Sequence, residues 1–524
     1  MKVGGESPKR LKDQESSSLK HGTLGESEVK YLEEQDYRAY QIRVKKGHRL
    51  YAYFSEQSRL AKNLYNHANF FIRQVYTAVT QETPLQPNQV EVMNTIAYYL
   101  PIMNKSQIKA WEKREAEVRA GTRTKNQEKP KLFSAPSKKI AYLGYAFLDA
   151  LFRTMQEENY EALSAQAAQG VLKNLNQNWK SFFASSKEYK KHPDKYLGKP
   201  KFPHYLNKDG LKEVTFTNQD CNVKEEKYLK FPGTKNNLNI GKVAKMSGAL
   251  QEVRVIPAYD HFTVEVIMKN EPPKETQEDN GRYLAIDLGT VNLVTIVTNI
   301  LDLTPILIRG GKIKALNQLY NKLNAEYYSI LRKGKEPKEG QHTSKRLRKL
   351  AEKRHDRIKD AFHKISRYVV HYAIEHEISK IVIGHNVAWK QESNMGKRNN
   401  QNFVFLPHSL LIQMIEYKAK ATGIEVIINE ESYTSKASAL DNDFIPTFGV
   451  IQGDEKPTFS GKRKYRGLYV AKNGTKINAD VNGAANILRK VYPSAFTGEG
   501  VAGCVKTPLV VQFDARNSDL NASA

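Results

Sequence analysis

Two aspartates in the C-terminal half have the surroundings that metal chemistry needs. Asp287 ends the apolar run 283–286 and is followed by Gly289, which permits a bound group to approach closely. Asp480 begins a predicted helix, and small residues at 483–485 allow that helix to pack tightly on a sheet. Carboxylates brought together in this way can share divalent ions, and two ions about 4 Å apart hold the attacking and leaving oxygens of a phosphodiester. The pair therefore indicates metal-dependent phosphodiester chemistry.

Each aspartate also has an ordinary structural interpretation. The pattern Asp-x-Gly-Thr at 287–290 occurs in sugar kinases and actin-like ATPases, and an aspartate in a tight turn is often structural. A carboxylate at a helix start, such as Asp480, is commonly a cap. The two aspartates together favour a shared site more strongly than either does alone.

The elements that must position these residues form an α/β pattern. Short apolar strands are predicted at 283–286, 293–297, 381–383 and 424–428. They alternate with helical regions at 312–378, at 408–421 and from 480 onward. Strands alternating with helices predict one α/β domain of mixed sheet over residues 281–495.

The N-terminal half follows a different pattern. We expect a disordered tail at 1–36, because this segment is polar, charged and poor in aromatic residues. A first barrel segment at 37–54, with a strand at 40–45, precedes a helical block at 55–200. Short period-two strands at 201–272 follow and predict a small antiparallel sheet or barrel, which can include the early strand. Residues 496–524 are predicted to be a flexible tail.

The charge balance points to a polyanionic partner. Lysine and arginine number 82 against 56 acidic residues, giving a net charge of +26. Such a field attracts nucleic acid, because neutralising phosphates releases condensed counterions. No apolar run reaches the roughly 18 residues of a membrane helix, and the N-terminus lacks the apolar core of a secretory signal. With two cysteines far apart in sequence, we expect a cytoplasmic protein that binds no membrane.

Several segments resemble motifs of the TnpB transposon nucleases and of the related type V CRISPR effectors. Residues 285–295 (AIDLGTVNLVT) resemble the first motif of their RuvC domain. Residues 430–438 (EESYTSKAS) and 478–488 (NADVNGAANIL) resemble the later motifs in the same order. Residues 381–391 (IVIGHNVAWKQ) with 396–403 (GKRNNQNF) resemble one branch of TnpB.

The resemblance implies a function and an architecture. The function is that of an RNA-guided DNA endonuclease, which binds a structured guide RNA and cleaves guide-matched DNA beside a short flanking motif. The fold class is multidomain α+β, in which a wedge-type β-barrel with a helical recognition insertion precedes an RNase H-like RuvC domain. Within that domain lie a helical insertion at 312–378 and a target-loading loop at 436–478. The guide RNA can be transposon-derived or CRISPR-derived, and the second partner is target DNA.

One departure from the family concerns the second catalytic carboxylate. The usual glutamate follows an apolar triplet, and in this chain that position is Gly384, which cannot bind metal. Some TnpB branches and their eukaryotic Fanzor relatives carry a relocated glutamate before a Tyr-Thr-Ser segment, and Glu431 occupies that place. Glu430 and Glu392 remain alternatives. The resemblance thus implies that Asp287, Glu431 and Asp480 hold Mg²⁺, with Mn²⁺ a possible substitute.

A second departure concerns the zinc knuckle of many relatives. Its four cysteine positions fall on Ser438, Asp441, Val470 and Asn473, none of which supplies a thiolate. We therefore predict no structural zinc.

Basic residues in three segments are candidates for contact with nucleic acid. They are Lys345, Arg346, Arg348, Lys349, Lys353, Arg354 and Arg357; Lys397 and Arg398; and Lys462, Arg463, Lys464 and Arg466.

Two rival functions stay open. A catalytically silent RNA-guided repressor of the same fold is favoured by Gly384 and opposed by Asp287 and Asp480. A DNA-strand transposase with a similar fold and no guide RNA is the other.

Overall fold

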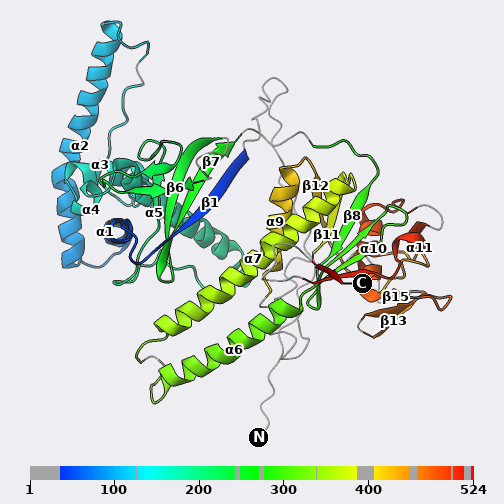
Figure 1. Ribbon diagram of the computed structural model, residues 1–524. Coiled ribbons are helices and arrows are strands. Elements are labelled where there is room, and N and C mark those ends of the chain that lie inside the picture. The colour runs from blue at the N-terminus through cyan, green and yellow to red at the C-terminus, as the bar shows by residue number, and fades with distance from the viewer. Residues whose placement is uncertain are drawn as a thin grey trace.

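The computed structural model describes residues 36–523, with gaps at 126–127, 242, 244–247, 271–275, 338, 386–405, 448–456, 466, 497–499 and 513–520. Two large sheets organise the chain, one in each half (Figure 1). The protein is thus a mixed α/β multidomain molecule. Of the helices described, none has the length and apolar content to cross a membrane.

The N-terminal sheet is antiparallel and joins segments far apart in the chain. Its order is β1 (Asp36–Lys45), β7 (His261–Asn270), β6 (Ala249–Ala258) and β2 (Val214–Thr217). β1 pairs with β7 along its whole length. The early strand therefore joins the later ones, and the helical block is inserted between them.

The β-barrel predicted at 201–272 is not found as a closed barrel among the described residues, which form the antiparallel sheet that was its alternative. β1 and β2 are the two edges of the sheet, and no described pairing joins them. β3 (Asn222–Lys224), β4 (Tyr228–Lys230) and β5 (Asn237–Asn239) form a separate three-stranded sheet instead. β2 is only four residues long, and a turn after it directs the chain into this small sheet, so β2 offers too little edge for closure.

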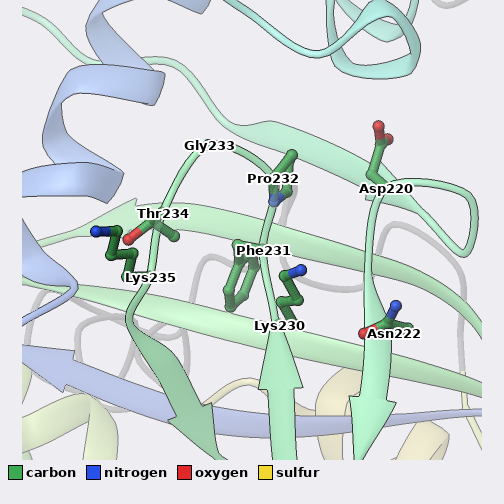
Figure 2. Close-up of a pocket in the computed structure, with 8 residues that line it drawn as sticks. All are labelled: Asp220, Asn222, Lys230, Phe231, Pro232, Gly233, Thr234 and Lys235. Atoms are coloured by element: carbon green, nitrogen blue, oxygen red, sulfur yellow. The ribbon is translucent and has the colours of Figure 1, made fainter.

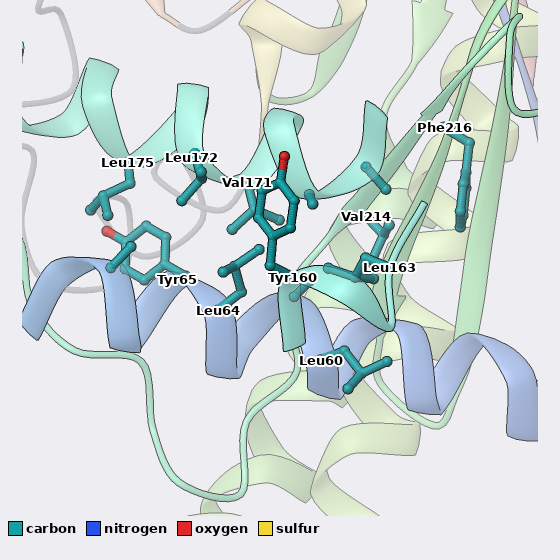
Figure 3. Packing of buried hydrophobic residues seen from close by; sticks show 14 of the residues in the cluster. Leu60, Leu64, Tyr65, Tyr160, Leu163, Val171, Leu172, Leu175, Val214 and Phe216 are labelled. Atoms are coloured by element: carbon teal, nitrogen blue, oxygen red, sulfur yellow. The ribbon is translucent and has the colours of Figure 1, made fainter. Parts of the chain in front are cut away.

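The inserted helices share one apolar core with the N-terminal sheet. They are α1 (Tyr51–Thr80), α2 (Pro87–Arg119), α3 (Tyr145–Thr154), α4 (Glu158–Glu161) and α5 (Ala165–Lys191), followed by the short helix Pro193–Lys195. Figure 3 shows Leu60 and Leu64 of α1 beneath Val171 and Leu175 of α5. Fully buried Trp179 donates to Asn69 Oδ1 at 3.0 Å, which satisfies its indole N–H.

The segment 37–54 contains a strand and the start of a helix. The strand predicted at 40–45 is β1, which ends at Lys45, and α1 begins at Tyr51, one turn before the predicted start of the helical block at residue 55. The apolar face explains the difference, because Leu50 and Phe54 lie four residues apart and are both completely buried.

The C-terminal sheet has seven strands in the order β12-β11-β8-β9-β10-β16-β17. Their bounds are β8 (Tyr283–Asp287), β9 (Asn292–Thr298), β10 (Ile306–Arg309), β11 (Lys380–Gly384), β12 (Glu425–Asn429), β16 (Leu509–Gln512) and β17 (Asn521–Ser523). β8, β11 and β12 are parallel to one another, whereas β9 is antiparallel to its neighbours.

Helices cover both faces of this sheet. α7 (Lys345–Glu375) and α9 (His408–Lys420) share one apolar cluster with the strands, and α6 (Gly311–Arg332) packs on α7. α10 (Ala479–Val491) covers the other face, with a small sheet of β13 (Lys462–Tyr465), β14 (Leu468–Val470) and β15 (Lys476–Asn478) before it. α6 and α7 occupy the segment for which a helical insertion was expected.

The expected flexible tail at 496–524 is partly wrong. After α11 (Gly500–Cys504), β16 pairs in parallel with β10 and so belongs to the sheet. Val511 is 1% exposed and lies in the same apolar cluster as the strands and α7. Leu509 and the two valines that follow it form too short an apolar run to predict a strand from the sequence. The segment becomes a strand because β10 supplies its hydrogen-bond partners.

We predict that Val511→Ala destabilises the C-terminal half by about 2 kcal/mol, because buried methyl groups are lost and a cavity remains. The measurement is the midpoint of thermal or urea unfolding. Gln512→Ala, at an exposed position of the same strand, is the control and should leave the midpoint unchanged. Equal midpoints for Val511→Ala and the parent would show that the segment is a free tail.

Candidate functional site

Three parallel strands end at one edge of the C-terminal sheet. In register, Ile383 of β11 lies beside Ile286 of β8, and Gly384 lies beside Asn429 of β12. Asp287 is the last residue of β8, and Glu431 follows two residues after the end of β12. The strand topology therefore brings both acidic residues to the same edge.

The start of α10 adds Asp480 to this edge. Asn478 caps the helix, since its side-chain oxygen accepts from the backbone N–H groups of Asp480 at 2.9 Å and Val481 at 3.2 Å. The carboxylate of Asp480 is thus not needed as the cap. A methyl group built on Gly483 would lie 2.9 Å from Asp287 Oδ2, so one turn of α10 lies against the carboxylate of Asp287.

The carboxylate of Glu431 fills the space beside Gly384. A methyl group built on Gly384 would lie 2.8 Å from Glu431 Oε2 and 2.5 Å from Ile487 Cδ1 of α10. Position 384 therefore has no room for a side chain, and Glu431 reaches the place that such a side chain would take.

Glu430 is oriented elsewhere. It pairs with Lys490 and accepts from the backbone N–H of Ser432 at 2.7 Å. Burial alone would raise the pKa of Glu430, but these contacts outweigh it and the pKa is lowered. Glu392, the third alternative, lies outside the described residues.

The pKa values of the carboxylates reflect burial and mutual repulsion. Burial, together with the charges of Glu431 and Asp480, raises the pKa of Asp287 well above its usual range. Burial and the charge of Glu430 raise the pKa of Glu431 to about 7. Asp287, Glu431 and Asp480 therefore form an acidic cluster whose mutual repulsion a bound proton or cation would reduce.

Asp480 has two partners of its own. Asn292 Nδ2 donates to Asp480 Oδ2 at 2.6 Å, and Arg463 Nη2 lies 3.3 Å from Asp480 Oδ1. Across the described part of the chain, no three His, Cys, Asp or Glu side chains are grouped to hold a metal ion. Asp287, Glu431 and Asp480 offer only carboxylate oxygens as ligands, and hard divalent cations such as Mg²⁺ prefer oxygen ligands.

Sequence reasoning missed Asn292 and gave Arg463 only a nucleic-acid role. Asn292 stood inside the quoted segment 285–295, and its signal was a polar residue at the start of an otherwise buried strand. Nothing in the spacing of Arg463 and Asp480 indicated that β13 folds back onto the start of α10.

The opposite face of α10 holds the loop that carries Glu431. Asn482 accepts from Ala439 N–H at 3.0 Å and donates to Ala437 O at 2.8 Å. Asn486 donates to Thr434 O at 2.9 Å, and Arg489 donates to Asn486 Oδ1 at 2.7 Å. These buried polar groups fix residues 434–443 to the helix.

The four positions that correspond to zinc-knuckle cysteines in relatives have ordinary hydrogen-bond partners here. Asp441 Oδ2 accepts from Ser438 Oγ at 2.6 Å and from Lys472 N–H at 2.9 Å. Val470 pairs with Lys462 in the small sheet, and Asn473 accepts from Thr475 N–H at 3.0 Å. A carboxylate thus links the two segments that a metal would otherwise join.

The seven basic residues of α7 that were predicted to contact nucleic acid divide into two groups. Lys345, Lys349, Lys353 and Arg357 recur every four residues and are exposed, so they form one stripe. The remaining three are engaged within the protein. Arg346 lies over Tyr327 at 4.5 Å, Arg354 lies over Tyr320 at 5.0 Å and donates to Asn317, and Arg348 is 3.9 Å from Asp260.

The other basic candidates lie mostly apart from these. Lys462 and Lys464 are exposed on β13. Lys397, Arg398 and Arg466 lie outside the described residues.

A groove of about 920 Å³ runs between β1, α7 and α9. Lys359, Arg367 and Lys418 line it together with Tyr40 and Tyr417. Burial and the charge of Arg367 lower the pKa of Lys418 to about 8, as expected where positive charges crowd together.

A second pocket, of about 440 Å³, lies at the turn between β4 and β5 (Figure 2). Lys230 and Lys235 line it, but so does Asp220, whose carboxylate accepts from Thr217 N–H at 3.1 Å. The mixed charge makes this pocket a weaker anion site than the groove.

The sequence comparisons confirm the resemblance to TnpB and to the type V effectors. A family model described as "Probable transposase" (OrfB_IS605) matches residues 261–390, and one described as "Cas12f1-like, TNB domain" matches 408–487. The TnpB-like protein ORF457 of Acidianus two-tailed virus is 24% identical over an alignment of 364 positions, which covers 64% of this chain and 74% of that protein.

Solved structures with a similar chain course include type V effectors. One is a Cas12f1–sgRNA–target DNA complex, with a TM-score of 0.38 and 12% identity, covering 86% of this chain and 98% of that one. Another is the mini-RNA-guided endonuclease CRISPR-Cas_phi3, with a TM-score of 0.35 and 10% identity, covering 70% and 87%. These superpositions are loose, so the relationship rests on the sequence matches.

We predict that the protein without divalent cations loses stability as the pH rises from about 5 to 8. Glu431 has a folded-state pKa of about 7 against an ordinary value of 4.5, so the folded state binds more protons than the unfolded state in this window. The measurement is the melting temperature in the presence of a chelator. Glu431→Gln should flatten this dependence, and an unchanged slope in that variant would contradict the raised pKa.

Proposed function

We propose, from the match to the TnpB and Cas12f1-like family models, that this chain is an RNA-guided DNA endonuclease. The observation that carries the proposal is the meeting of Asp287, Glu431 and Asp480 at one sheet edge, within or beside the matched segments. On this proposal, residues 281–512 form a RuvC-type nuclease domain, and the N-terminal sheet with its helices binds the guide RNA.

The three carboxylates would hold Mg²⁺, which when bound activates a water molecule and stabilises the leaving 3′ oxygen. Asp287 supplies a ligand from the rigid end of β8, and Asp480 supplies one from the first turn of α10. Glu431 takes the role of the glutamate that Gly384 cannot provide. Arg463 compensates part of the negative charge at Asp480.

The exposed stripe on α7 supports the binding of a nucleic-acid backbone. Lys345, Lys349, Lys353 and Arg357 present four positive charges along one helix face. A row of this kind suits the phosphates of a guide–target duplex, whose sequence is read by base pairing and not by the protein. The groove beside α7 adds cations next to tyrosines, a combination that suits unpaired bases.

A guided binder that does not cut is the second candidate. The specific observation in its favour is that the carboxylates of the described residues are not gathered into a ready metal-binding group. On this reading Glu431 would fill space beside Gly384 and nothing more.

Glu431→Gln discriminates between the two. We expect it to reduce cleavage of guide-matched DNA by at least about 100-fold, because a metal ligand that contributes several kcal/mol is lost. Binding of guide RNA and target DNA should change little. The measurement is cleavage of labelled DNA by protein purified with co-expressed RNA, alongside a binding assay at the same salt.

Glu430→Gln is the matched control. Its amide oxygen can still accept from Lys490 and Ser432, so cleavage should stay within about tenfold of the parent. Equal cleavage by Glu431→Gln and the parent would contradict the site assignment. Absence of any discrete co-purifying RNA would contradict the guided function and favour a transposase.

We predict that substitutions of Lys353 and Arg354, which are neighbours on α7, have different effects on nucleic-acid binding. Lys353→Ala should weaken nucleic-acid binding and reduce the slope of log affinity against log salt by about 1, as for one lost phosphate contact. Arg354→Ala should leave that slope unchanged and lower the melting temperature, since Arg354 packs on Tyr320 and Asn317. The same slope change in both variants would refute the division of α7 into two groups.

A further inference from the structure

Asn292 is a buried amide in direct contact with the acidic cluster. It is 7% exposed and is the first residue of β9, a strand that is buried along its whole length. Its Nδ2 donates to Asp480 Oδ2 at 2.6 Å, a short bond to a charged acceptor.

The amide is held there at a cost in stability. Its other polar atom, Oδ1, is buried and has no hydrogen-bond partner among the described residues. An unsatisfied buried acceptor is unfavourable, and an apolar side chain of similar size would avoid it. The contact with Asp480 is therefore what the asparagine provides at this position.

The preceding loop is built to place this residue. A methyl group on Gly289 would lie 2.4 Å from Asn292 O, so the loop closes only around a glycine. Gly289 N–H donates to Leu293 O at 3.3 Å, and β9 then runs antiparallel beside β8. Asn292 is thus fixed by the same strand pair that fixes Asp287.

We propose that Asn292 is a positioning residue, which holds the carboxylate of Asp480 in the orientation that a divalent cation requires. The proposal rests on the proposed function, because it assumes that Asp480 binds the ion. Asn292 itself touches no reacting atom. It fixes one oxygen of Asp480, while Arg463 lies beside the other, so the two contacts together orient the carboxylate.

The test is Mn²⁺ binding to the full-length protein, followed by the paramagnetic resonance signal of free Mn²⁺, together with the melting temperature. Asn292→Leu keeps the branched shape and the number of side-chain heavy atoms and removes the hydrogen bond. We expect the affinity for Mn²⁺ to fall by about 10–100-fold, as for other residues that orient a metal ligand. The melting temperature should stay level or rise, because the unsatisfied amide oxygen is removed.

Thr298→Val is the matched control on the same strand. Thr298 is 4% exposed, and its hydroxyl also has no partner among the described residues, but it lies at the far end of β9 beside Leu284. This variant should leave Mn²⁺ binding unchanged. Unchanged Mn²⁺ binding in Asn292→Leu, or a loss that runs parallel to a fall in melting temperature, would overturn the proposal.

Asp480→Ala separates this inference from the proposed function. If Asp480→Ala weakens Mn²⁺ binding and Asn292→Leu does not, only the role of Asn292 fails. If Asp480→Ala binds Mn²⁺ as the parent does, Asp480 is not a ligand, and both the metal site and the inference fail.

Discussion

The acidic cluster depends on how closely α10 lies against the ends of β8 and β11. Two glycines permit that approach. A side chain on Gly483 would strike the carboxylate of Asp287, and one on Gly384 would strike Ile487 and Glu431. A side chain at the end of β11 would therefore compete with Glu431 and Ile487 for the same space. In this chain the loop after β12, the neighbouring strand, brings a carboxylate to that place.

α10 controls that loop as well. Asn482, Asn486 and Arg489 lie on the side of the helix turned away from the strand ends, and each is buried and hydrogen-bonded to residues 434–443. Such a network has one well-satisfied arrangement, because an unpaired buried amide or guanidinium would be costly. One helix therefore sets the position of Asp480 directly, the surroundings of Asp287 through Gly483, and Glu431 through its loop.

Local pattern was enough to place Asp287 and Asp480, since a strand end and a helix start are visible in short segments. Glu431 was predicted through the resemblance to TnpB branches with a relocated glutamate, and its place just after a strand agreed with that prediction. The contacts of Asp480 with Asn292 and Arg463 could not be predicted in this way. They join residues from three elements, and the spacing of residues in the sequence does not show how these elements pack. The barrel and the C-terminal tail failed for a related reason. Whether β2 closes a barrel or β16 joins a sheet is decided by the neighbouring edge and not by the strand's own residues.

The net charge of this protein is positive, whereas the charge of the acidic cluster is negative. A net charge of +26 draws in a polyanion, whereas three carboxylates at one sheet edge repel it. Arg463 offsets part of that repulsion, but it engages Asp480 alone, and the pKa of Asp287 remains raised by its acidic neighbours. A divalent cation would remove the repulsion within the cluster and between the cluster and a phosphate at the same time. A proton on Asp287 or Glu431 would relieve the same repulsion, and the proposed function assigns that role to the cation.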